Sequence, residues 1–374
     1  MEKWRKVYIG GTDGETFLNS VHGQLGCVSC HGGKEPAGTP EEAHEGMLKD
    51  PSSQPDKYCA GCHTDVVEKH LTSIHKTQQG YFTMFSQRYH GVPDGEIPEH
   101  FTAEFNAECG KCHATCGQCH ISVPNSARGG LVSAHKFNKT PDMTKNCTAC
   151  HGSRIGDEYL GNNEGYSPDA HWVPKLMRCE ACHTGSEMHG DGTRYESKLK
   201  VQEMPRCENC HQNNTSNTYH QVHWGELSCN TCHSQTYRNC NSCHVGGSGI
   251  TGDPYFTFKI GKNPIPEDRN YQWVTLRHIP VSNDTYGPWG YEPLPFYNSM
   301  PTWKYTAPHN VRKNAPQTAV DSTAALPCAG SCHNNENLFL RPSDIPPGEE
   351  TANQGVVVSD DEWQQLLQKW SVKK

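Results

Sequence analysis

Residues 109–120 read Cys-Gly-Lys-Cys-His-Ala-Thr-Cys-Gly-Gln-Cys-His, which is one five-residue pattern written twice. The same pattern, two cysteines separated by two residues and followed by histidine, occurs seven more times between residues 27 and 244. A tenth copy has one extra residue between its cysteines and reads Cys328-Ala-Gly-Ser-Cys332-His333. Together the ten copies use all 20 cysteines of the 374-residue chain.

The ten patterns contain two sets of candidate site residues. The cysteines are Cys27, Cys30, Cys59, Cys62, Cys109, Cys112, Cys116, Cys119, Cys147, Cys150, Cys179, Cys182, Cys207, Cys210, Cys229, Cys232, Cys240, Cys243, Cys328 and Cys332. The histidines that follow them are His31, His63, His113, His120, His151, His183, His211, His233, His244 and His333.

The pattern is typical of covalent attachment of c-type haem. Two thiols add to two vinyl groups of one porphyrin, and the adjacent histidine becomes the proximal ligand of the iron. A single Cys-x-x-Cys is as typical of a zinc or thiol redox site, and cysteines also form disulfide frameworks, but none of these requires the histidine. Histidine occupies 23 of 374 positions, so ten accidental matches have a probability of about one in 10¹². The sequence therefore predicts ten covalently bound haems.

The composition agrees with a cofactor-filled interior. Only 33% of the residues are hydrophobic, while the net charge is only −8. Such a chain has too few apolar side chains for an ordinary core and too little charge for a disordered tail. The slightly acidic balance argues against a nucleic-acid partner, and no apolar run approaches the ~18 residues of a membrane span.

Thirteen histidines lie outside the patterns, more than ten irons need as second axial ligands. We predict ten distal ligands: His22, His44, His75, His135, His171, His189, His220, His223, His278 and His309. His220 and His223 are three residues apart, so on a helix they share a face and can serve two neighbouring haems. The remaining His70, His90 and His100 are expected to be surface or hydrogen-bonding residues.

The expected fold is mostly irregular, with short α-helices and few short strands around a stacked haem chain. Residues 1–244 form a multihaem region with nine sites, residues 245–340 an aromatic and proline-rich cover with the tenth, and residues 341–374 a haem-free tail. Low aliphatic content argues against the alternative, an accessory domain with its own core.

Local patterns predict a few regular elements along this chain. Helices are expected at 65–75 and 361–370, and strands at 255–260 and 271–276. Val356-Val-Val is expected to be an edge strand able to pair with another chain.

The chain resembles the multihaem cytochromes c. Ser20-Val-His22-Gly, Ser73-Ile-His75, residues 109–120 and residues 229–244 are similar to segments of the hydroxylamine oxidoreductase and octahaem tetrathionate reductase group. The count of ten and the aromatic region also resemble surface cytochromes of metal-reducing microbes, some of which form filaments. The resemblance implies bis-histidine haems in contact and export, with an extracellular or cell-surface location, or a periplasmic one. The first residues contain no hydrophobic signal segment. If the protein is exported, we expect the numbering to begin at the processed chain.

Two classes of function follow from these features. The first is an electron conduit with no catalytic residue, whose partners are redox proteins or extracellular acceptors and which self-assembles into a polymer. The second is a reductase or oxidase of a small nitrogen or sulfur oxyanion with one open haem, for which Arg88, His90, His100 and Lys111 are candidate residues. A haem store or gas sensor is a third alternative.

Overall fold

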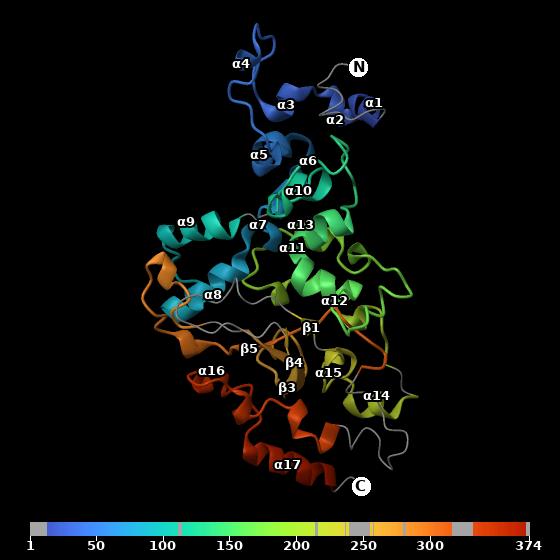
Figure 1. Cartoon of the computed structure of the whole chain (residues 1–374), viewed down its shortest axis with the longest axis vertical. Helices are drawn as coiled ribbons and strands as arrows, with labels where there is room; N and C mark the ends of the chain where they lie inside the picture. Colours follow the sequence, from blue (N-terminus) through green and yellow to red (C-terminus); the bar gives the residue numbers. More distant parts are fainter. Residues whose placement is uncertain are drawn as a thin grey trace. The chain divides into compact units, whose positions relative to one another are not determined.

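The protein is described here by a computed structural model that covers residues 13–110, 114–213, 216–235, 237–238, 255–256, 258–279, 282–315 and 332–371 (Figure 1). About 45% of the structure is helical, and the strands are few and short. The chain divides into two compact units. Unit 1 comprises residues 1–81, 98–152 and 178–204, and unit 2 comprises residues 82–97, 153–177 and 205–374. The expected short helices and few strands are therefore confirmed.

Unit 1 consists of short helices joined by loops. Its α-helices are α1 (Asp13–Leu18), α2 (Val21–Gln24), α3 (Cys27–His31), α4 (Pro40–Ala43), α5 (Pro55–Tyr58), α6 (Ala60–His70), α7 (Ile74–Thr77), α9 (Glu99–Glu108), α10 (Cys116–His120), α11 (Thr148–His151) and α13 (Gly185–His189). Single 3-10 or π turns occupy Pro51–Ser53, Asn125–Ala127, Met143–Cys147, Cys179–Ala181 and Lys198–Lys200. Its buried hydrophobic side chains, among the described residues, are Val67, Phe101, Phe105, Met143 and Val201.

Unit 2 combines helices with two small antiparallel sheets. Its helices are α8 (Gln79–His90, which begins in unit 1), α12 (Asp157–Leu160), α14 (Thr218–His223), α15 (Cys229–His233), α16 (Glu350–Asn353) and α17 (Asp360–Ser371). One sheet pairs β1 (Tyr237–Arg238) with β2 (Tyr255–Phe256). The other has the order β3 (Lys259–Lys262), β4 (Trp273–His278) and β5 (Trp303–Tyr305).

The three-stranded sheet has a hydrophobic core of its own. Val274 and Leu276 of β4 are fully buried against Trp303, Leu340 and Val356. A second cluster joins Ile260 of β3 to Phe339, Val358 and Trp363 of α17. Figure 1 shows β3, β4 and β5 beside one another, followed by the red C-terminal helices. The low aliphatic content of the sequence argued against a separate core in this region, and that expectation was wrong. A few hydrophobic residues are enough, because the strands and the C-terminal tail both contribute side chains to the core.

The segment Val356–Val358 is not an edge strand, so that prediction was wrong. Its side chains are buried, and its backbone bonds to the sheet, with the Lys262 N–H donating to the Val356 carbonyl at 3.0 Å. Gly261 makes this approach possible, because a Cβ there would lie 2.7 Å from the same carbonyl oxygen. The three valines therefore bind within the chain and offer no free edge to another copy.

The other local predictions are partly confirmed. The helix expected at 361–370 is α17, and the two strand regions contain β2, β3 and β4. The helix expected at 65–75 instead begins at Ala60, ends at His70, and is followed by α7 after a break. Ser73 starts that new helix, because its hydroxyl accepts a hydrogen bond from the Lys76 N–H and caps the turn.

An aromatic cluster joins α8 to the loop at 286–291 within unit 2. The fully buried Phe85 ring lies 5.0 Å from Tyr89, 5.3 Å from Tyr286 and 5.5 Å from Tyr291, measured between ring centroids. Contacts of this kind favour edge-to-face geometry and add to the energy of burial. They fix one face of α8 against the 282–300 loop.

Across the parts of the chain that the structure describes, no helix is both long and apolar enough to cross a membrane.

The shared core predicts that α17 stabilises the sheet. Trp363 is 4% exposed and packs on Phe339 and Arg341, so Trp363→Ala should lower the free energy of unfolding of this region by about 3–5 kcal/mol. Chemical denaturation followed by circular dichroism measures the change. Gln368→Ala, an exposed position on the same helix, is the control. Equal stability of both variants would show that α17 does not belong to the core.

Candidate functional site

Five of the described Cys-x-x-Cys-His patterns form or begin with a single helical turn, while Cys59–His63 opens the longer helix α6 and Cys147–His151 joins a π turn to α11. Helices α3, α10 and α15 span a whole pattern each, and 3-10 turns begin at Cys179 and Cys207. Thr115 caps α10 by accepting a hydrogen bond from the Gln118 N–H. One helical turn places both cysteines and the histidine on neighbouring positions, as attachment to one flat ring requires.

Seven pattern histidines face a histidine from outside the patterns. The pairs, with the distance between ring centroids, are His63 with His22 (6.1 Å), His31 with His135 (6.0 Å), His151 with His75 (6.2 Å), His120 with His189 (6.0 Å), His211 with His171 (5.9 Å), His233 with His220 (6.2 Å) and His333 with His223 (6.0 Å). All seven non-pattern members belong to the predicted distal set. Each pair lies within a single unit.

The separation of the rings identifies the kind of site. Two metal–imidazole bonds of about 2 Å, with each ring centre about 1 Å beyond its nitrogen, place rings on opposite sides of one ion about 6 Å apart. Tetrahedral binding, as in structural zinc sites, would bring the same centres to about 5 Å. The observed 5.9–6.2 Å fits two imidazoles on opposite faces of one metal. The residues therefore fit bis-histidine haem iron better than zinc.

Hydrogen bonds at Nδ1 orient several of these rings so that Nε2 is left for a metal. A histidine ligand usually donates its other ring N–H to a carbonyl or carboxylate, which fixes the tautomer and the ring plane. The Nδ1 contacts are His31 to Leu48 O (2.7 Å), His120 to Asn138 O (2.7 Å), His233 to Arg312 O (3.1 Å), His223 to Tyr219 O (3.0 Å) and His171 to the Asp169 carboxylate (2.8 Å).

Burial keeps paired histidines in the neutral form. Burial, with a smaller contribution from His75, lowers the pKa of His151 to about 4. Burial likewise lowers the pKa of His22 and of His189 below the ordinary value, with the partner histidine adding to each shift. Neutral imidazole is the form that binds a metal.

Cysteines of different patterns also lie side by side. A neighbouring thiol, and then burial, raise the pKa of three cysteines: Cys59 beside Cys116, Cys147 beside Cys179, and Cys229 beside Cys207. Burial, with a contribution from Cys150, raises the pKa of Cys119 to about 11. Burial and then Cys59 raise that of Cys30. These thiol neighbours show which Cys-x-x-Cys-His patterns lie close together in space.

Three other predicted ligands are placed differently. His278 bonds through Nε2 to the Glu349 carboxylate at 2.9 Å, so the nitrogen that ligation needs is already engaged. His44 is exposed at the end of α4, and His309 is half-buried in unit 2. The pattern histidine His183 bonds through Nδ1 to Glu187 at 2.9 Å. Cys112, His113, Cys240, Cys243, His244 and Cys328, like Lys111, lie outside the described residues.

The histidines expected at the surface behave in two ways. His90 and His100 are partly or fully exposed, and the His90 Nε2 bonds to the Glu96 carbonyl at 2.7 Å. His70 is only 6% exposed, its Nε2 is buried without a hydrogen-bond partner, and burial lowers its pKa to about 4. His70 is therefore not a surface residue, but its Nδ1 lies 3.5 Å from the Ser73 hydroxyl, so the prediction of a hydrogen-bonding histidine is confirmed. His70 is the last residue of α6, and the sequence around it has no regular hydrophobic spacing that would have predicted its burial.

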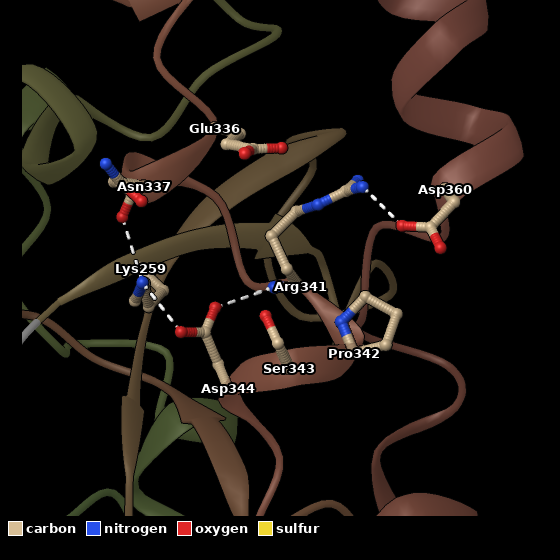
Figure 2. A pocket seen from close by; sticks show the side chains of 8 residues that line it. All are labelled: Lys259, Glu336, Asn337, Arg341, Pro342, Ser343, Asp344 and Asp360. Carbon is tan, nitrogen blue, oxygen red and sulfur yellow. Dashed lines mark hydrogen bonds and ion pairs between the residues drawn. The ribbon is translucent and has the colours of Figure 1, made fainter.

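A polar pocket lies where β3 meets the tail (Figure 2). Lys259 bonds to Asp344 at 2.9 Å, and Arg341 bonds to Asp360 at 2.6 Å and to the carbonyls of Val358 and Ser359. Both cations are satisfied by the chain itself. The pocket is therefore explained as a set of ion pairs that attach the tail to the sheet.

Comparison of the chain with models of protein families, with curated proteins and with solved structures finds no match.

The ring pairs predict which histidine substitution leaves one iron without its second axial ligand. His75→Ala removes the partner of His151, so the reduced, haem-loaded variant should bind one carbon monoxide per chain, read from the visible spectrum. His100→Ala is the matched control, because this exposed histidine does not belong to the predicted distal set, and it should bind none. Carbon monoxide binding by both variants, or by neither, would contradict the pairing. If His75→Ala does not mature, His223→Ala gives the same test at His333.

Proposed function

We propose that this chain is a decahaem c-type cytochrome that conducts electrons through haems held by histidine on both faces. The observation that carries the proposal is the set of seven His–His pairs at 5.9–6.2 Å, each joining one pattern histidine to one outside the patterns. When bound, a c-type haem supplies an iron that accepts and releases single electrons.

The chain's own residues favour transfer over catalysis at these seven sites. Two histidines take both axial positions, which leaves no position where a substrate would bind the metal. The Nδ1 bonds of rings such as His31 and His120 hold the ligands in one orientation. Ligands held in place in this way reduce the rearrangement that accompanies a change of charge, which suits fast electron exchange.

The thiol contacts support a continuous order of sites within each unit. In unit 1, thiol contacts link Cys59 to Cys116 and Cys147 to Cys179, and Cys59 and Cys150 are close enough to influence the pKa of Cys30 and of Cys119 respectively. The proposed order is thus the site of His31, then those of His63, His120, His151 and His183. In unit 2, Cys207 adjoins Cys229, and helix α14 supplies His220 to the site of Cys229 and His223 to the further site of His333. Neighbouring sites in an unbroken series are what conduction requires.

Reduction of a small oxyanion is the second candidate function. It needs one metal with an open position and nearby cationic or phenolic groups. At the seven paired sites both positions are taken, which favours conduction. One observation favours the second candidate: Arg88, a residue considered for this role from the sequence, is buried among tyrosines.

Location and partners stay predictions from the resemblance. These are an extracellular or cell-surface position, redox proteins or extracellular acceptors as partners, and self-assembly into a polymer. Electron microscopy of the purified protein tests the last of them, and a monodisperse monomer across salt and pH would contradict it. The buried Val356–Val358 segment does not serve as the contact between copies.

Carbon monoxide tests the conduit directly. The intact protein, reduced with dithionite, should show almost no carbon monoxide spectrum, because imidazole occupies both axial positions of each iron. Quantitative difference spectroscopy measures the bound fraction per chain. Stoichiometric binding of one carbon monoxide per chain would reject the conduit and favour the reductase.

A further inference from the structure

The strongest unexplained feature outside the histidine pairs is the buried guanidinium of Arg88 in α8. Arg88 is 2% exposed, and its Nε, Nη1 and Nη2 atoms are all buried without a hydrogen-bond partner. Its Cζ lies 4.7 Å from the centre of the Tyr297 ring, which covers the flat face of the group and leaves the N–H edge unsatisfied. A buried charge is stable only when it is paired and hydrogen-bonded.

A second cation from another element faces the same region. Lys304 of β5 has its Nζ 2.9 Å from the Met84 sulfur, which is a weak acceptor for an ammonium group. Burial, and then the charge of Arg88, lower the pKa of Lys304 to about 7. Two positive groups from α8 and β5 are thus held close together without a matching anion.

A buried carboxylate of the same region is engaged through only one of its two oxygens. Glu349 is 3% exposed, and its Oε2 accepts hydrogen bonds from Thr302 and from the His278 Nε2, while its Oε1 is buried without a hydrogen-bond partner. Glu349 is close enough to influence Arg88, yet no ion pair joins them among the described contacts. Two cations and one engaged carboxylate leave the region with excess positive charge.

A comparison within unit 2 shows what is missing. Arg341 is also buried, at 8% exposed, and also stacks on an aromatic ring, that of Trp363. Its guanidinium nevertheless donates to Val358, Ser359 and Asp360, as Figure 2 shows for Asp360. The chain therefore satisfies one buried arginine completely and leaves the other open.

We propose that Arg88 and Lys304 form a buried binding site for one small oxyanion, with Tyr297 covering its side. The planar fork of arginine matches a carboxylate or an inorganic oxyanion in bidentate fashion, and lysine adds a point charge. Because Arg88 is almost fully buried, polyanions such as nucleic acids are excluded. The same chemistry has two sources: a free inorganic anion, or a propionate carboxylate of a haem in this unit.

Titration of the oxidised, haem-loaded protein with sulfate in chloride buffer separates the two sources. A free-anion site should bind one sulfate per chain by calorimetry, and Arg88→Gln or Lys304→Gln should weaken binding by roughly 30-fold or more. A propionate site should bind no sulfate, but Arg88→Gln should shift the midpoint potential of a single haem. Lys175→Gln, the same charge change at an exposed position of unit 2, should do neither.

The proposal is overturned if sulfate does not bind and the Arg88→Gln variant, loaded with ten haems, keeps every midpoint potential. Should that variant not fold, a structure of the haem-loaded wild type decides. It must show an anionic oxygen about 3 Å from Arg88 or Lys304, and Glu349 closing on Arg88 would refute the site. Neither result depends on whether carbon monoxide binds, so this site and the conduit fail separately.

Discussion

The separation between paired imidazole rings is the constraint on which the rest of this molecule depends. A metal held between two histidines requires ring centres about 6 Å apart on opposite sides, and seven pairs meet that requirement within 0.2 Å of it. To hold so many pairs, the chain must place each pattern helix opposite a second helix or loop. The short helices, the capped turns and the small number of buried aliphatic side chains in unit 1 all follow from that need.

The two units hold their histidine pairs with different secondary structure. In unit 1, helices such as α6, α7 and α13 present histidines directly, and few hydrophobic side chains are buried. In unit 2, a sheet with its own core packs against the tail, and its strand β4 contacts the pattern helix α15. Arg88 and Lys304 also lie in unit 2. The sheet and the segments that cover it bury these charged groups.

The sequence was sufficient for the sites and insufficient for their pairing. Twenty cysteines in one repeated pattern predict haem attachment without any tertiary information, and the surplus of histidines predicts distal ligands. Partners cannot be read from proximity, however: His22 lies five residues before Cys27 yet faces His63, and His223 precedes Cys229 yet faces His333. His220, by contrast, lies nine residues before Cys229 and does face His233 of that pattern, so distance along the chain does not decide the partner.

Local sequence patterns also failed to predict which side chains are buried. His70 and Arg88 sit in segments with weak periodicity and are enclosed by residues distant in sequence, so both look exposed from the sequence alone. From the sequence alone, Val356–Val358 looks like an edge strand. Its burial depends on Gly261, almost a hundred residues earlier, because a glycine there lets the backbone of β3 approach the Val356 carbonyl. Each case is decided by tertiary contact and not by propensity.

The count of iron and haem in the natively matured chain tests the central claim most directly. Elemental analysis together with a pyridine haemochrome assay should give ten irons and ten covalently bound haems per polypeptide, with no zinc. Zinc in place of iron, or markedly fewer than ten irons, would show that the paired imidazoles hold something else and would contradict this account.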